Sequence, residues 1–290
     1  MLSSNIINPI DYRDSKTYYV SYVDVLGYND VIKNDKEPEK LLNAIIGVIN
    51  NLIDVIGKLP KFQDAEPPKI NYNIISDGIV INIGCWEKPI LLSDHWDNYT
   101  NFMLCVMLTA NIQKTYLSHG FLCKGGLSYG KLVNEGKIIF GEGLAKAVDI
   151  EHNNHNPCVV IDDKVVELFL QSLIDTGQDF DDKQIGRILI RDGDKTFLHY
   201  MSADAILDVF IGKALEGDGR EYLAVHKEGL EKALKRFINN HREKGAEESV
   251  ADKYRWSIAY HDENNASDDN TLLIDKTLHE ELDSIVIRKD

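Results

Sequence analysis

The chain has 290 residues, of which 43% are hydrophobic, and a formal net charge of −15 at pH 7. This length suits one large domain or two small ones, and the apolar fraction suffices for a sizeable core. The negative charge argues against broad nucleic-acid binding, which needs a basic face to neutralise phosphates. It does not exclude a nucleotide substrate, because a metal ion and a few local cations can hold a triphosphate inside an acidic protein.

The sequence predicts neither a membrane span nor a secretory signal. It contains no apolar run of about 18 residues or more, the length that a transmembrane helix requires. Residues 1–8 lack a basic region followed by an apolar core. The cysteines are widely spaced, so we expect buried, reduced thiols in a cytoplasmic protein. They are Cys85, Cys105, Cys123 and Cys158.

The first half of the chain alternates strand and helix patterns after a polar arm over residues 1–16. This β-α-β-β-α-β order predicts an α+β fold with a ferredoxin-like core, an antiparallel sheet that has helices on one face. In chain order we expect a strand at 18–25, a helix at 39–58, strands at 70–75 and 79–83, a helix at 98–119, strands at 121–129, 132–134 and 138–140, and a helix at 143–152.

The second half of the chain is less distinctive. Its patterns predict a strand at 158–161, a helix at 164–173, a hairpin of 187–191 with 197–201, and helices at 222–244 and 253–261. We therefore expect a main domain over residues 17–201 and a helical C-terminal extension, residues 202–290, packed on the same domain.

Two aspartates stand out because each follows an apolar β run and precedes a glycine. Asp24 is followed by Gly27, and Asp77 by Gly78. Taken singly, Asp24 could cap the next helix, and Asp77 could be an ordinary Asp-Gly turn residue. Together, two carboxylates from neighbouring strands make an oxygen-rich site that suits Mg²⁺ or Mn²⁺ and leaves room for phosphates.

Other residues near these aspartates could contact a phosphate. Gly27 and Tyr28 would form a strand-to-helix turn, where backbone N–H groups bind phosphate well. Lys124 either faces solvent on its strand or supplies a cation to a triphosphate. The glycines that follow it leave backbone uncovered, as the close approach of another segment or of a ligand requires. They are Gly125, Gly126 and Gly130.

The order Asp24, Asp77, Gly-rich strand and Gly-to-helix turn at 140–151 resembles the class III nucleotidyl cyclase catalytic domain, over residues 18–151. The resemblance implies that Asp24 and Asp77 hold two metal ions, with the carbonyl of Val25 as a backbone ligand. It implies that Lys124 replaces an arginine that contacts phosphate, and it places Arg191 near a lysine that reaches the terminal phosphate. It also implies a head-to-tail homodimer with sites at the interface.

The sequence departs from that family at several positions. The helix asparagine and the arginine that stabilises the transition state are replaced by Ala145 and Asp149. The residues that read adenine are replaced by Asn73 and Ile138, which disfavours ATP as the substrate. Because Asn73 carries both a donor and an acceptor, it can pair with a uracil or a cytosine edge.

The C-terminal segment narrows the resemblance. The residues Lys253-Tyr-Arg-Trp256 and Tyr260-His261 are similar to those of the bacterial pyrimidine cyclases in Pycsar antiphage systems. The resemblance implies conversion of UTP, or of CTP, to a cyclic monophosphate that activates a separate effector protein. Two alternatives remain: a catalytically degenerate cyclase-like nucleotide sensor or dimerisation module, and an adenylate or guanylate cyclase.

Overall fold

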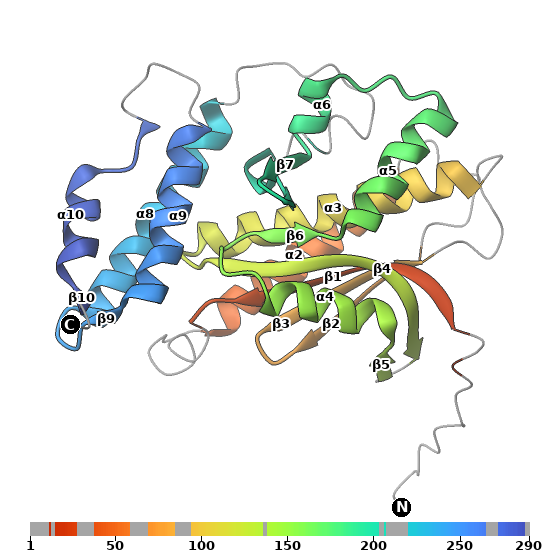
Figure 1. The fold of residues 1–290 in the computed structure, drawn as a ribbon. Coiled ribbons are helices and arrows are strands. Elements are labelled where there is room, and N and C mark those ends of the chain that lie inside the picture. Colours follow the sequence, from red (N-terminus) through yellow and green to blue (C-terminus); the bar gives the residue numbers. More distant parts are fainter. Residues whose placement is uncertain are drawn as a thin grey trace, which may run out of the picture.

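The computed structural model describes residues 12, 15–27, 38–58, 69–84, 94–135, 138–202, 206, 220–264 and 272–287. A mixed sheet forms the centre, with helices on both of its faces (Figure 1). The predicted α+β fold is confirmed. Apart from Tyr12, Ser15 and Lys16, the predicted N-terminal arm lies outside the described residues, and Lys16 belongs to the first strand rather than to the arm.

The central sheet has the order β2-β3-β1-β4-β6-β8-β7, and β5 pairs with β4 off this path. Only β4 and β6 run parallel among these described neighbours. The strands are β1 (Lys16–Val25), β2 (Ile70–Ile75), β3 (Gly78–Gly84), β4 (Cys123–Glu135), β5 (Ile138–Phe140), β6 (Val159–Ile161), β7 (Leu189–Asp192) and β8 (Lys195–Leu198).

Long helices follow β1 and β3 in the chain, and another long helix lies in the C-terminal part. They are α2 (Pro38–Gly57), α3 (Asp94–Ser118), α4 (Glu142–His152), α5 (Asp163–Thr176), α6 (Asp182–Gly186), the 3₁₀ helix η3 (Tyr200–Ser202), α8 (Arg220–His241), α9 (Glu248–Glu263) and α10 (Lys276–Ser284). A small parallel pair, β9 (Ala246–Glu247) and β10 (Val286–Ile287), joins the end of the chain to the segment before α9.

The first elements, β1-α2-β2-β3-α3-β4, form the predicted ferredoxin-like core, because β2, β3, β1 and β4 are adjacent in that order and antiparallel. The strands predicted at 121–129 and 132–134 are one strand, because Gly130 continues the pairing of β4 by lying opposite Tyr18 on β1. The short helix α6 and the helix α10 were not predicted from the sequence.

The two faces of the sheet carry separate apolar clusters. Alternate residues of β1 and β3, among them Tyr19 and Ile81, point toward α2 and α3 and join the main core. The intervening residues Val20 and Val80 form a smaller cluster with Ala147 of α4 on the opposite face. This alternation is the period of two that a strand imposes on its side chains.

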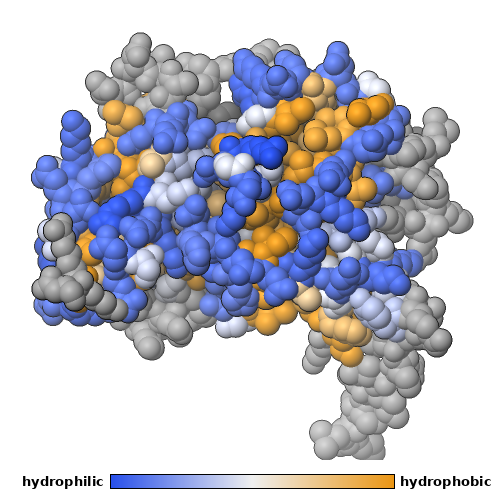
Figure 2. Space-filling view, viewed as in Figure 1, coloured by the Kyte–Doolittle hydropathy of each residue, from blue (hydrophilic) through white to orange (hydrophobic). Residues whose placement is uncertain are grey.

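Helix α3 lies between the sheet and the C-terminal helices. Its residues 102–108 are all fully buried, so the helix is covered on every side. The C-terminal helices contribute Leu234, Ile258 and Leu278 to the same continuous core. These helices therefore share one hydrophobic core with α3. The face seen in Figure 2 carries hydrophilic side chains over much of its area and exposes hydrophobic residues at its centre and upper right.

Helix α2 carries the one stretch among the described residues that is long and apolar enough to cross a membrane, Glu39–Gly57. Length and composition alone give this result, and core helices of soluble proteins meet the same criterion. One side of α2 is buried in the core at spacings of three and four residues, the pattern of an amphipathic helix packed on a sheet. The buried residues are Leu41, Ile45, Ile49, Leu52 and Ile56.

Candidate functional site

Asp24 and Asp77 lie at the same end of two neighbouring strands. Asp24 pairs across β1 and β3 with Gly78, the residue after Asp77. Asp77 belongs to a two-residue turn that joins β2 to β3, in which Ser76 takes a positive φ of 58°. Both aspartates are half-buried. The structure thus brings together the two carboxylates that the sequence singled out.

Negative charge is concentrated around Asp24. Burial, Asp77 and Glu151 raise the pKa of Asp24 to about 6, against the opposing effects of Lys124 and His152. Burial and the same acidic residues raise the pKa of Tyr22 to about 12. Because the ionised carboxylates disfavour one another, a bound cation would stabilise this site.

Glu151 also belongs to the candidate site, and it was not predicted from the sequence. Its carboxylate accepts a hydrogen bond from Lys124, with 2.6 Å between Oε1 and Nζ, and Lys124 also donates to the Glu151 carbonyl oxygen at 3.2 Å. The two side chains are only 4% and 15% exposed. Lys124 therefore does not face solvent: it forms an ion pair on the face of the sheet that carries Asp24.

A signal for Glu151 existed in the sequence. Helix α4 buries Gly143, Ala147 and Glu151, which are four residues apart and so share one stripe of the helix. A glutamate on the buried stripe of a helix needs a partner, because an unpaired buried charge is costly. The partner, Lys124, is 27 residues away in the chain, so no local pattern indicates the pair.

The Gly-rich segment of β4 brings α4 close to the sheet. A Cβ at Gly126 would lie 2.2 Å from the Ala147 carbonyl oxygen, and one at Gly130 would lie 2.8 Å from the Gly143 backbone nitrogen. The glycines thus allow the close approach of another chain segment, one of the two uses that the sequence analysis left open. This contact places Glu151 within reach of Lys124.

The remaining predicted site residues lie in different places. The Val25 side chain is buried in the main core, and Gly27 follows β1 with a φ of 77°. Tyr28 lies outside the described residues. Arg191 is exposed on β7, at the far edge of the sheet from β2, so the structure does not bring it to Asp24.

Asn73 lies on β2, on the same face of the sheet as Asp24, opposite Val80 of β3. It belongs to a group of asparagines. Asn134 donates to Asn82 at 3.1 Å and lies 3.5 Å from the Asn73 oxygen, while Asn71 donates to Asn82 at 3.3 Å. The group places several amides on the same face of the sheet as Asp24.

The carboxylate oxygens of Asp24 and Asp77 fit a hard divalent cation, which prefers oxygen ligands. Within the described part of the chain, no group of three or more His, Cys, Asp or Glu residues is placed to hold a metal ion together. Magnesium needs few protein ligands, because it keeps several waters and uses substrate phosphates as ligands. The two aspartates are therefore compatible with a metal that binds together with a phosphorylated substrate.

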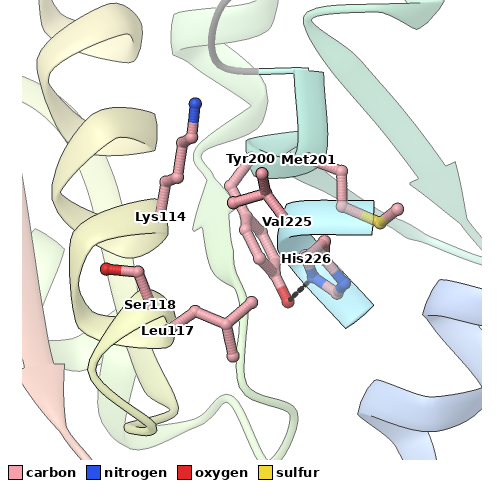
Figure 3. Close-up of a pocket in the computed structure, with 7 residues that line it drawn as sticks. All are labelled: Lys114, Leu117, Ser118, Tyr200, Met201, Val225 and His226. Atoms are coloured by element: carbon pink, nitrogen blue, oxygen red, sulfur yellow. Dashed lines mark hydrogen bonds between the residues drawn. The ribbon is translucent and has the colours of Figure 1, made fainter. Parts of the chain in front are cut away.

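A second polar cluster lies where α3, η3 and α8 meet. His226 forms a hydrogen bond with Tyr200, Nε2 to Oη 3.2 Å (Figure 3). It forms a second one with His261, Nδ1 to Nδ1 2.8 Å. The cavity beside Tyr200 and His226 measures only about 10 Å³, room for about one water molecule. This cluster is thus part of the packing between the extension and the main domain, and it is too small for a substrate.

No protein-family model matches the chain, and no curated protein is significantly similar to it. Solved structures give weak matches. The adenylyl cyclase CyaB from P. aeruginosa is 14% identical with a TM-score of 0.35, over 54% of this chain and 81% of that chain. The monomeric guanylyl cyclase domain of the RhoGC fusion protein from the aquatic fungus Blastocladiella emersonii is 10% identical with a TM-score of 0.38, over 63% and 94%.

A third match is a class III adenylyl cyclase-like ATP-binding protein from Pseudomonas aeruginosa, 10% identical with a TM-score of 0.38, over 68% of this chain and 43% of that chain. Identities and TM-scores this low assign no activity to the chain.

Proposed function

We propose that the chain is a metal-dependent nucleotidyl cyclase that converts UTP, or CTP, into the 3′,5′-cyclic monophosphate and diphosphate. The observation that carries the proposal is the placement of Asp24 and Asp77 at adjacent strand ends, where burial and mutual repulsion raise the pKa of Asp24 to about 6. Keeping two acidic groups this close disfavours folding, so a ligand that uses them explains their presence.

Asp24 and Asp77, with the Val25 carbonyl, would hold Mg²⁺ or Mn²⁺, two ions per site. When bound, these ions supply charge neutralisation at the phosphates and acidify the ribose 3′-hydroxyl. In the reaction, the ribose 3′-hydroxyl gives its proton to water and its oxygen forms a bond to the α-phosphorus. The bond from that phosphorus to the bridging oxygen breaks, and diphosphate leaves. Gly27 and Tyr28 would contact the phosphates, and so would Arg191 if the partner subunit brings it there.

Lys124 would stabilise negative charge on the substrate while remaining paired with Glu151. The ion pair fixes the ammonium group on the face that carries Asp24, with 2.6 Å between Nζ and Oε1. A preorganised cation lowers the cost of charge development, because it needs no rearrangement during the reaction. Glu151 is thus a positioning residue in this scheme.

Asn73 would read the base edge. Its position on the same sheet face as Asp24, among other amides, supports this role. The preference for UTP over CTP follows only from the resemblance of the C-terminal segment to the pyrimidine cyclases. A head-to-tail homodimer would complete the base pocket, and the cyclic product would activate a separate effector during phage infection.

The proposal is tested by incubating the protein with each of the four nucleoside triphosphates and Mn²⁺, and by identifying cyclic products by mass spectrometry. We expect cyclic UMP or cyclic CMP from the wild type and none from Asp24→Ala or Asp77→Ala. Asp163→Ala, which removes an exposed acid on α5, is the matched control and should retain activity. No cyclic product from any triphosphate would reject the proposal.

A second candidate function is a nucleotide sensor or dimerisation module without catalysis. Ala145 and Asp149, which stand where the family carries an asparagine and an arginine, are exposed on α4 and favour this candidate. Binding of a nucleoside triphosphate without turnover in the same assay would support it. Cyclic AMP or cyclic GMP as the sole product would instead support an adenylate or guanylate cyclase.

A further inference from the structure

A pocket of about 290 Å³ lies between the main domain and the C-terminal extension. Its walls are Leu26 and Gly27, which follow the last residue of β1, the turn between α3 and β4, and one side each of α8 and α9. Leu26 is two residues after Asp24, so the pocket lies close to the acidic site in the chain. Its volume falls at the small end of ligand pockets, which measure about 300–1,000 Å³.

The pocket is basic although the protein is acidic. The chain has 47 Asp and Glu residues against 32 Lys and Arg residues. Among the described residues that line the pocket, none is acidic, whereas Arg236, Lys253 and His241 all contribute to the wall. Such a local reversal of charge attracts a small anion.

Packing holds Arg236 in a defined orientation. Its guanidinium group lies 4.0 Å from the centre of the Phe121 ring, a cation–π contact between α8 and the start of β4. Stacking uses the face of the guanidinium group, while its N–H donors lie in the plane. A planar arginine oriented in this way suits the oxygens of a phosphate.

Lys253 connects the pocket to the acidic site. Burial and the neighbouring Lys124 lower the pKa of Lys253, and Glu151 and Asp24 oppose this effect. Two lysines from different elements therefore lie close enough to repel each other. An anion in the pocket would favour the charged form of Lys253, which lines the wall.

The aromatic residues of the pocket are already stacked on one another. The Phe237 ring lies 4.3 Å from the rings of both Tyr254 and His241, between centroids. Phe121 is covered by Arg236. A ligand with an aromatic ring would have to displace these contacts, whereas an anion without a ring would not. The volume and the stacked walls together select a compact anion.

We infer that this pocket binds a diphosphate group, held by Arg236 and Lys253 from the C-terminal extension. The group could be inorganic diphosphate or the terminal phosphates of a nucleoside triphosphate. The inference deepens the proposed function, since the proposed reaction uses the second and releases the first. It gives the C-terminal helices a role in binding in addition to packing.

The test is isothermal titration calorimetry of the full-length protein with inorganic diphosphate, without added metal. We expect saturable binding to the wild type and binding about tenfold weaker to Arg236→Gln and to Lys253→Met, because each loses a charge-assisted hydrogen bond. The matched control is Lys235→Gln, which removes a charge from an exposed position of the same helix and should bind like the wild type. Absence of binding to the wild type, or equal binding to all variants, would overturn the inference.

Repeating the titration with UTP, with UMP and with orthophosphate distinguishes inorganic diphosphate from the terminal phosphates of a nucleoside triphosphate. If Arg236→Gln weakens UTP and inorganic diphosphate alike, the pocket holds the terminal phosphates of a triphosphate. If it weakens only inorganic diphosphate, the pocket holds the released product. Equal affinity for UMP and diphosphate would contradict the inference.

Thermal melting of each variant checks that it is folded. If Arg236→Gln does not fold, the affinity of Lys253→Met for diphosphate tests the inference. The binding readout is independent of turnover. Diphosphate binding without any cyclic product would support the inferred binding site and reject the proposed cyclase activity. Cyclic product without diphosphate binding would support the cyclase activity and reject the inferred binding site.

Discussion

Lys124 on β4 and Glu151 on α4 form a nearly buried ion pair, with 2.6 Å between Nζ and Oε1, on the sheet face that carries Asp24. Asp24 is the direct cross-strand neighbour of Lys124. The pair thus fixes the helix against the sheet at the candidate site, so a change in one carboxylate alters the electrostatics of the others.

Asp24→Asn should stabilise the metal-free protein at high pH. The pKa of Asp24 rises from 3.8 to about 6 on folding, so the ionised form disfavours the native state above pH 6, and the cost disappears below 3.8. Since the side chain is only half-buried, we expect a gain of about 1–2 kcal/mol at pH 8 and less at pH 5. Urea unfolding at both pH values measures this gain in the free energy of unfolding, with Asp149→Asn as the control. An equal gain at pH 8 and pH 5 would contradict the raised pKa of Asp24.

Glu151→Gln should destabilise the fold by about 2 kcal/mol or more, because Lys124 keeps its charge in a largely buried position and loses the carboxylate to which it donates its 2.6 Å hydrogen bond. The control is Asp54→Asn, which breaks the exposed Lys58–Asp54 pair and should cost less than about 1 kcal/mol. Urea unfolding of both variants at pH 7.5 gives the comparison. Similar losses in the two variants would mean that the Lys124–Glu151 pair is no stronger than a surface pair.

The buried histidines should make the protein sensitive to acid. Burial and Arg187 lower the pKa of His199 from 6.5 to about 4, and its Nδ1 lies 2.6 Å from the Tyr260 hydroxyl. The unfolded chain therefore binds a proton that the native state does not, and stability falls as the pH drops from 6.5 to 4, by up to about 3 kcal/mol. Burial and His261 lower the pKa of His226 too, which acts in the same direction.

His199→Gln should reduce this acid sensitivity, measured as the change in unfolding free energy between pH 7.5 and pH 5. The exposed His155 provides the control His155→Gln, which should show the same pH dependence as the wild type. Asp24 acts in the opposite direction over part of the same range, so the comparison uses the difference between variants. An unchanged pH dependence in His199→Gln would show that His199 is not responsible.

Gly126→Ala should separate α4 from the sheet. The added Cβ would lie 2.2 Å from the Ala147 carbonyl oxygen, and only a shift of the α4 backbone away from the sheet could relieve this clash. We expect a loss of about 3 kcal/mol. Gly186→Ala, whose Cβ would meet nothing within 4 Å, should change stability little. Equal melting temperatures for the two variants would rule out this close contact.

Asn73→Ala should alter base selectivity more than triphosphate binding, if the cyclase proposal holds. A site that hydrogen-bonds one base edge rejects the mismatched base, because its polar groups are then left unpaired. Competition between UTP and CTP, scored by mass spectrometry of the cyclic products, reports the change. Asn71→Ala, on the same strand and face but further from Asp24, is the matched control. The wild-type product ratio in Asn73→Ala would exclude Asn73 as the base reader.

Local patterns were sufficient for the strands and helices of the ferredoxin-like core. The apolar run of β1 and the turn at Asp77 and Gly78 lie where the sequence predicts them, because strand alternation and turn chemistry act over a few residues. Helix α10 was missed, since its stripe consists of little more than Leu278 and Leu282 in a polar segment.

The candidate site was predicted only in part, for a physical reason. Asp24 and Asp77 are unusual within their own segments, so they can be recognised one at a time. Glu151 and Lys253 could not be recognised from their own segments, because the residues with which they interact are distant in the chain and are brought near them only by the fold. Pairing of this kind depends on how α4 and α9 pack, which periodicity does not specify.

The burial of α3 has a consequence for synthesis of the chain on the ribosome. Gly229 of α8 packs directly on the Leu117 backbone, and Lys232 donates to the Ser118 carbonyl at 3.1 Å, more than 100 residues later in the sequence. Because translation adds about 5–20 residues per second, that side of α3 stays uncovered for roughly 5–20 s, until α8 has been synthesised. During this interval an apolar surface is exposed to solvent or to a chaperone, so the nascent chain can aggregate until α8 has been made.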